Sequence, residues 1–167
     1  MRLWMSSNLI DSVFDNVIAD LRSRSKKEVY RTDPALWAEE VLGKHMWSKQ
    51  REIAASVVDN SHTAVVSCNG AGKSGLAGML AVWWVAVHDP YDVAVICSAP
   101  TYVQIARVLF TEIKTNFDLA KGNGVTLPGH INQSQEWKLD DGYVMAWGRR
   151  PAAYWSVTPP IWPLPGN

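Results

Sequence analysis

The sequence predicts an α/β fold in three layers, with a mainly parallel sheet and flanking helices. Two short apolar runs that contain β-branched residues, 62–67 and 92–99, are typical of buried strands. An apolar helix is expected over residues 74–88, and residues 101–118 repeat apolar side chains at intervals of three and four. Strand, helix, strand and helix in succession indicate parallel strands joined by right-handed crossovers.

Helices are also expected in the first third of the chain. Residues 6–30 begin as an amphipathic helical pattern. They end in a cluster of four cations: Arg22, Arg24, Lys26 and Lys27. This cluster either contacts DNA or a partner, or is a solvated helix end. Asp33 and Pro34 favour the start of a short helix that runs to about Leu42, and Gly43 favours its end. A further helix is expected over residues 48–60.

The last third of the chain predicts a hairpin and then an irregular tail. Residues 135–139 and 143–147 flank Asp140, Asp141 and Gly142, a sequence typical of a tight turn. Residues 153–167 are rich in proline and show no periodicity. We therefore divide the chain into an N-terminal helical segment (1–45), a partial nucleotide-binding core (46–152) and an irregular tail (153–167).

Composition restricts the possible classes of protein. The 167 residues carry 16 basic and 16 acidic side chains, so no global positive field indicates nucleic acid. Cys68 and Cys97 form neither a disulfide framework nor a zinc motif, which suits a reducing cytoplasm. The longest uncharged run, residues 74–87, is too short to cross a bilayer, so we expect no membrane partner.

Residues 67–74 form the motif that carries the chemistry. They read Ser67, Cys68, Asn69, Gly70, Ala71, Gly72, Lys73 and Ser74, between a predicted strand and a predicted helix. Small residues let backbone N–H groups turn toward a polyphosphate, and the helix N-terminus favours negative charge. Lys73 is expected to reach the terminal phosphates of ATP, and the Ser74 hydroxyl to hold Mg²⁺. The predicted fold is accordingly P-loop NTPase-like, although Ser67 replaces the usual first glycine.

Two further segments have both a functional and a structural interpretation. Gln50 can hydrogen-bond the edge of adenine while Trp47 walls the base, or both can be ordinary helix residues. Thr101 and Gln104 follow the second predicted strand. They form either a simple helix cap or a segment that senses phosphates or contacts DNA, because α/β sheets bind ligands where their strands end.

Together these segments resemble the large subunit of tailed-bacteriophage terminases, the ATP-driven motors that package viral DNA. The resemblance covers roughly residues 33–152 and rests on residues 47–53, 67–74 and 98–104, with further likeness at 137–142 and 148–152. It implies that Gln50 contacts adenine and that Thr101 and Gln104 form a coupling segment. It also implies that the phosphates and Mg²⁺ are bound by Ser67, Asn69, Gly70, Ala71, Gly72, Lys73 and Ser74.

The same resemblance implies the partners of the chain. They are double-stranded DNA, the small terminase subunit, the capsid portal and further copies in a ring, all in the cytoplasm of an infected bacterium. ATPases of this class also need an acidic motif, four apolar residues followed by Asp-Glu. The nearest strings end at Asp15 and at Asp141, and neither ends a buried strand.

We therefore expect a fold that is incomplete at its C-terminal side, with an unpaired sheet edge, as in a truncated or frame-shifted product. Catalysis stays open between an ATPase that is completed by other segments and a remnant that binds nucleotide without hydrolysis. Another phosphate-loop enzyme, such as a helicase fragment or a small kinase, is a third interpretation, although Arg149 and Arg150 alone are thin support for a kinase lid.

Overall fold

Two helices open the computed structural model, which describes residues 5–149. They are α1 (Met5–Thr32) and α2 (Pro34–Leu42). Asp33 caps α2, because its carboxylate accepts hydrogen bonds from the N–H groups of Ala35 at 3.0 Å and Leu36 at 2.9 Å. Gly43 ends α2 in the left-handed conformation, with φ +64°. The predictions for both helices are confirmed.

The segment between the next two helices differs from its prediction. α3 (Ser48–Asp59) and α4 (Lys73–Val87) match the helices predicted over 48–60 and 74–88. Residues 62–67 belong to no strand of the described sheet, so the strand predicted there is wrong. Val66 is 98% exposed, and the segment is held instead by Thr63, whose hydroxyl donates to the carbonyl of Ser56 at 3.1 Å.

A small mixed sheet follows α4. Its strands are β1 (Val95–Ser98), β2 (His130–Ile131), β3 (Glu136–Lys138) and β4 (Val144–Arg149), in the order β1-β4-β3-β2. β1 and β4 run parallel, whereas β3 pairs antiparallel with both β2 and β4. The predicted hairpin is confirmed: Gly142 turns with φ +90°, and its N–H donates to the carbonyl of Leu139 at 3.0 Å.

β1 forms one of the two edges of the described sheet. β1 has β4 as its neighbour on one side and no described strand on the other. Ile96, in the middle of β1, is 59% exposed. The backbone of β1 is therefore unpaired on its outer side. Because every open sheet has such edges, this one does not test the expectation that a further strand is missing.

Helical segments lie on both sides of β1 in the chain. A 3₁₀ turn, η1 (Pro90–Asp92), precedes β1, and the chain then forms α5 (Tyr102–Gln104), the π-helical turn η2 (Ile105–Leu109) and α6 (Phe110–Gly122). The helical prediction for residues 101–118 is confirmed, although one π turn interrupts it. The irregular tail predicted at 153–167 lies outside the described residues.

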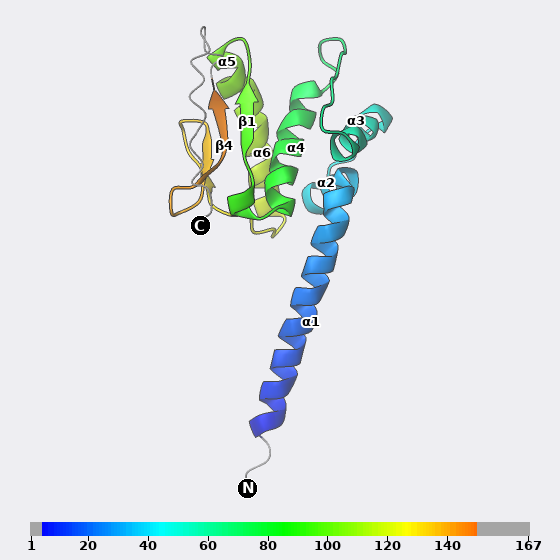
Figure 1. Cartoon of the computed structure of the whole chain (residues 1–167), viewed down its shortest axis with the longest axis vertical. Helices are drawn as coiled ribbons and strands as arrows, with labels where there is room; N and C mark the ends of the chain where they lie inside the picture. Colours follow the sequence, from blue (N-terminus) through cyan, green and yellow to red (C-terminus); the bar gives the residue numbers. More distant parts are fainter. Residues whose placement is uncertain (1–4, 150–167) are drawn as a thin grey trace, which may run out of the picture.

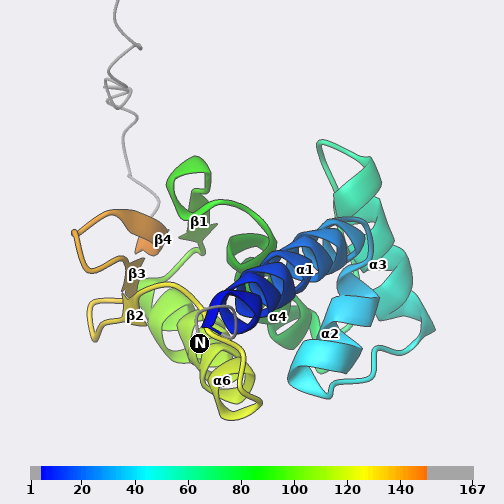
Figure 2. The same ribbon diagram turned by 90° about the horizontal axis from the view of Figure 1, so that it is seen from below.

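The predicted fold class is wrong. The structure is 59% helical with a four-stranded mixed sheet, rather than a three-layer fold around a mainly parallel sheet. Within residues 5–149, α4 and α6 pack on one face of the sheet, and no helix covers the other face (Figure 2). The physical reason is that an apolar run has no fixed strand partner: residues 62–67 remain outside the sheet, and residues 136–149 fold back on themselves by local hairpin pairing.

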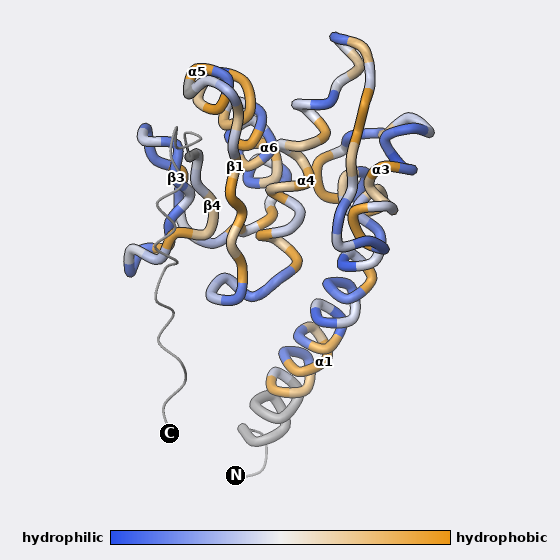
Figure 3. The backbone as a smooth tube through the Cα atoms, turned by 45° about the horizontal axis from the view of Figure 1, so that its top comes forward, coloured by the Kyte–Doolittle hydropathy of each residue, from blue (hydrophilic) through white to orange (hydrophobic). Residues whose placement is uncertain are grey.

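Buried tryptophans hold several elements together. Trp37, Trp83 and Trp137 are at most 2% exposed. Trp83 of α4 donates its indole N–H to the carbonyl of Tyr30 at 2.8 Å, which fixes the end of α1. Trp137 of β3 donates to the carbonyl of Pro128 at 2.7 Å and meets Phe117 of α6 edge-on. Hydrophobic stretches of β1 and α4 are visible in Figure 3.

α4 occupies the centre of this arrangement (Figure 1), and it approaches α6 closely. A β-carbon on Gly78 would lie 2.6 Å from Cβ of Glu112 and 3.0 Å from its backbone carbonyl carbon, closer than such atoms can approach. A β-carbon on Gly75, one turn earlier, would lie 3.8 Å from the nearest Glu112 atom, an ordinary contact. Position 78 therefore requires glycine for packing, whereas position 75 does not.

We predict opposite effects of alanine at these two positions. Gly78→Ala should lower the free energy of unfolding by about 1–3 kcal/mol, because the α6 backbone must move away. Gly75→Ala should leave it unchanged or raise it by up to about 1 kcal/mol through helix propensity. Chemical denaturation monitored by circular dichroism measures both. Equal destabilisation by the two variants would contradict the close contact at Gly78.

Candidate functional site

The glycine-rich loop ends in a left-handed cap at the start of α4. Gly70 and Gly72 have φ of +80° and +79°, a conformation that glycine adopts without strain. Gly72 is the residue that caps α4, and its carbonyl accepts the first backbone hydrogen bond of the helix from Leu76 at 2.9 Å. In the described part of the chain, the backbone N–H groups of Gly72, Lys73 and Ser74 donate to no protein acceptor. These groups are free to receive an anion.

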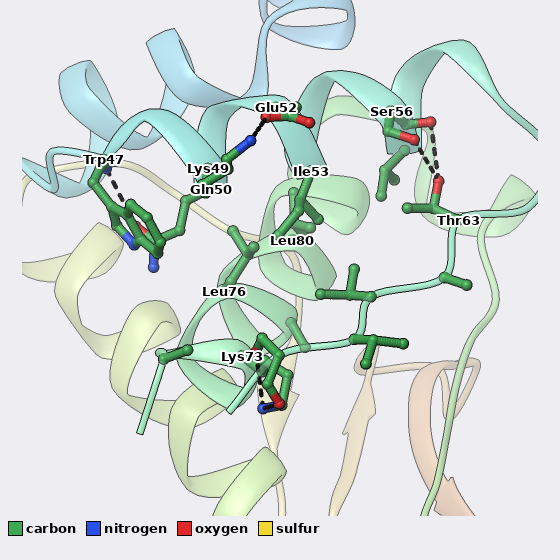
Figure 4. A pocket seen from close by; sticks show the side chains of 17 residues that line it. Trp47, Lys49, Gln50, Glu52, Ile53, Ser56, Thr63, Lys73, Leu76 and Leu80 are labelled. Carbon is green, nitrogen blue, oxygen red and sulfur yellow. Dashed lines mark hydrogen bonds and ion pairs between the residues drawn. The ribbon is translucent and has the colours of Figure 1, made fainter. Parts of the chain in front are cut away.

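Lys73 is turned toward its own loop (Figure 4). Its ammonium group donates to the carbonyl of Cys68 at 2.7 Å, and to both the carbonyl and the hydroxyl of Ser67 at 3.0 Å. All three donors of the ammonium thus have oxygen acceptors within residues 67–68. The side chain is exposed, so it can exchange these acceptors for others without crossing the core.

A cavity of about 670 Å³ adjoins the loop. It lies between α3, residues 63–67 and the first half of α4 (Figure 4). Its wall is largely apolar, with Ile53 of α3 facing Leu76 and Leu80 of α4. Polar groups from Gln50, Ser67 and Lys73 stand at its border. The cavity is therefore a largely apolar recess that opens beside the glycine-rich loop.

Gln50 lies beside the loop as well. A β-carbon on Gly72 would be 3.1 Å from the amide nitrogen of Gln50, so these two residues are neighbours. The Gln50 carbonyl oxygen accepts the N–H of Trp47 at 3.4 Å, which anchors the side chain at the start of α3. Trp47 is half exposed at the rim of the cavity. The structure thus brings together two segments that are about twenty residues apart in the sequence.

Not every residue that the sequence proposed reaches this cavity. Ser67, Ala71, Lys73 and Gln50 line it, whereas Asn69, Gly70, Gly72 and Ser74 lie on the loop but not in the cavity wall. Thr101 and Gln104, for which the resemblance implies a coupling role, are also absent from the lining. They form a reciprocal cap: Thr101 N–H donates to the Gln104 side chain, and Gln104 N–H to the Thr101 hydroxyl, both at 3.3 Å. The structure supports their capping interpretation.

The two strings nearest to the acidic motif, which end at Asp15 and Asp141, lie away from the glycine-rich loop. Asp15 is on the exposed part of α1. Asp141 is in the turn between β3 and β4, where the Tyr91 hydroxyl donates to it at 2.7 Å and thereby lowers the pKa of its carboxyl. Among the described residues, no group of three or more His, Cys, Asp or Glu side chains could hold a metal ion.

Sequence reasoning missed the apolar wall and one acidic neighbour. Leu76 and Leu80 face the cavity on the same side of α4 as Lys73, and their spacing of three and then four residues from Lys73 is the signal that could have identified them. Glu112 lies alongside the first turns of α4, near Gly75 and Gly78. Nothing in the sequence indicates Glu112, because its position depends on how α6 packs.

Comparison with protein-family models, with curated proteins and with solved structures gives no match to this chain. Within residues 5–149, no helix combines the length and the apolar character needed to cross a bilayer. Any function proposed for this chain therefore rests on its sequence and on the geometry of the loop and its cavity.

The two cysteines differ sharply in accessibility, which provides a probe of the loop. Cys68 is exposed on the loop, whereas Cys97 in β1 is buried, and burial raises the pKa of its thiol to about 11. Because the thiolate is the reactive form, the raised pKa leaves very little reactive Cys97 near neutral pH.

We predict that N-ethylmaleimide at pH 7.5 alkylates Cys68 at least about tenfold faster than Cys97. Mass spectrometry of tryptic peptides over time measures both rates. The Cys68→Ser variant is the control, since it should show only the slow reaction, and urea should then expose Cys97. Equal rates in the folded protein would contradict the burial of the Cys97 side chain.

Proposed function

We propose that this chain binds a nucleoside triphosphate, ATP with Mg²⁺, at the loop of residues 67–74. The observation that carries the proposal is that the free N–H groups of Gly72, Lys73 and Ser74 belong to the loop whose Ser67, Ala71 and Lys73 line a cavity, together with Gln50. Helix N-termini with free N–H groups attract phosphate through both hydrogen bonds and the helix dipole.

Each residue of the loop has a role in this proposal. The backbone of Gly70, Ala71 and Gly72 wraps the phosphates, because two of these residues adopt the left-handed conformation that turns successive N–H groups to one side. Lys73 exchanges its contacts with Ser67 and Cys68 for phosphate oxygens. Ser74, at the start of α4, offers its hydroxyl to Mg²⁺, which shields the phosphate charge when bound.

In this proposal the cavity holds the adenine base of the nucleotide. Its volume of about 670 Å³ lies within the usual range of small-ligand sites, roughly 300–1,000 Å³. Ile53 and Leu76 provide an apolar surface for a flat ring, and Trp47 at the rim can stack on it. The Gln50 amide, with one donor and one acceptor, complements the edge of adenine.

The larger assignment is to the motor of viral DNA packaging, as the ATP-binding part of a terminase large subunit. It is supported by the sequence resemblance at residues 47–53, 67–74 and 98–104, and by the proximity of the first two of these segments in the structure. The proposal includes double-stranded DNA, the small terminase subunit, the capsid portal and a ring of copies as partners, and the host cytoplasm as location.

A second candidate is a chain that binds nucleotide without hydrolysing it. The observation that favours this candidate is the location of the acidic strings: Asp15 lies on the projecting helix, and Asp141 is engaged by Tyr91. Phosphoryl transfer to water needs a carboxylate or amide that orients the attacking water, together with Mg²⁺ held by an acidic residue. Other phosphate-loop proteins, such as a helicase fragment, share the loop and remain a further alternative.

We predict that ATP with Mg²⁺ binds the wild-type chain and that Lys73→Ala weakens binding at least about tenfold, since a charged hydrogen bond to phosphate is worth about 1.5–3 kcal/mol. Lys49→Ala is the matched control: Lys49 borders the same cavity but is paired with Glu52 at 2.7 Å, away from the loop. It should change affinity less than about twofold. Isothermal titration calorimetry measures all three. Absence of wild-type binding, or equal loss in both variants, would overturn the proposal.

We further predict that the purified chain alone hydrolyses ATP at or near the background rate, because neither aspartate string lies at the loop. Release of phosphate, followed with and without Lys73→Ala, measures this. Brisk turnover that Lys73→Ala abolishes would reject the non-catalytic candidate and leave nucleotide binding intact.

A further inference from the structure

α1 projects from the body of the molecule as a bare helix (Figure 1). Its last turns are anchored: Lys27 donates to the carbonyl of His88 at 3.3 Å, and Arg31 donates to that of Val87 at 2.7 Å. By contrast, every described side chain from residue 12 to residue 26 is exposed. At 1.5 Å per residue, this exposed stretch extends about 21 Å, too far for the body to cover it.

An apolar stripe runs along the projecting part. Its members are at least 42% exposed and recur at intervals of one, three and four residues: Val13, Phe14, Val17, Ile18 and Leu21. At 100° per residue they span about 140° of the helix, so they form a single face. Figure 3 shows hydrophobic and hydrophilic residues alternating along this part of α1. Five adjacent large apolar side chains in water are a surface that association would cover.

The helix itself also benefits from a partner. Isolated helices of this length are marginal in water, because most helical stability in proteins comes from packing of an apolar face. The exposed turns have i, i+4 support from Asp20 and Arg24, which are 3.0 Å apart, but such exposed pairs contribute little. A contact that buries the stripe supplies the packing of this apolar face that the body of the molecule does not provide.

The charges beside the stripe identify the occupant. Asp15 and Arg22 are seven residues apart, so they lie on the same flank of the helix, one before and one after the middle of the stripe. A second α1 laid antiparallel, centred near residue 18, places Asp15 of one copy opposite Arg22 of the other, twice by symmetry. In a parallel pair the flank that carries Asp15 and Arg22 would face the other flank of the partner helix, so Asp15 and Arg22 would not meet.

We propose that α1 is a self-association surface: two copies of this chain pair antiparallel through Val13, Phe14, Val17, Ile18 and Leu21. The contact is isologous, with the same stripe used by both copies. The anchored turns of α1 lie beyond the stripe, so the two bodies lie at opposite ends of the pair. This proposal does not depend on the one for nucleotide binding.

Sedimentation equilibrium of the full-length chain tests the association. Wild type should dimerise, and Val17→Glu should weaken the dimer at least about tenfold, because a charge would be buried at its centre. Ala19→Glu is the matched control: Ala19 is exposed on the opposite face of α1, and this variant should leave the dimer within about twofold of wild type. A wild-type chain that stays monomeric at about 100 µM overturns the proposal, as does a monomer that binds anionic lipid vesicles instead.

Disulfide trapping tests the orientation without relying on stability. In a Cys68→Ser background, Val13→Cys and Arg24→Cys chains should cross-link when mixed, since the register that sets Asp15 opposite Arg22 also sets residue 13 opposite residue 24. Each variant alone should cross-link poorly, because the like positions would be about 16 Å apart along the axis. Efficient cross-linking of each variant with itself would indicate parallel pairing and overturn the proposal.

Charge exchange provides an independent check. Asp15→Arg or Arg22→Asp alone should weaken the dimer by about twofold to fivefold, and the double variant should restore it, because the pair is rebuilt with its signs reversed. Additive loss in the double variant would show that these two residues do not face each other, and would reject the antiparallel register.

Discussion

The close contact between α4 and α6 at Gly78 is the constraint on which the rest of the structure depends. With no side chain at position 78, the backbones of the two helices approach until Cβ of Glu112 fills the space. α4 is thereby fixed along its length. Its first residue, Lys73, belongs to the glycine-rich loop, Leu76 and Leu80 form one wall of the cavity, and Trp83 holds the end of α1. One helix thus carries the candidate site, the core and the anchor of the projecting arm.

The loop resolves an electrostatic conflict within itself. Lys73 places a positive charge at the N-terminus of α4, where the helix dipole is also positive, so the ammonium is unfavourable there without an anion. Three oxygens of Ser67 and Cys68 offset this by accepting its hydrogens. These contacts compete with any phosphate, so affinity reflects a difference between two sets of charge-assisted hydrogen bonds rather than the gain of one set.

Three surfaces of the described chain have apolar groups that the body leaves uncovered. At β1 the backbone of an edge strand is open and Ile96 is exposed, and next to the loop Val66 is almost fully exposed. Both are extended segments, and open edges of this kind favour pairing with other strands. On α1 the exposed stripe is helical, and its flanking Asp15 and Arg22 give it a preferred orientation. Only the helical surface therefore carries the information needed to specify its partner.

The sequence by itself determined the local elements. Asp33, Pro34 and Gly43 marked one helix, the turn at Gly142 marked the hairpin, and the glycines before Lys73 marked the loop, because caps, turns and amphipathic repeats act over a few residues. Only the tertiary structure decided which elements meet. Residues 62–67 have the composition of a strand yet pair with no described strand, and Thr101 and Gln104 serve each other as caps. Gln50 meets Gly72 because α1 and α2 hold α3 in place next to the loop. Pairing and packing depend on residues far apart in the chain, and no local pattern records them.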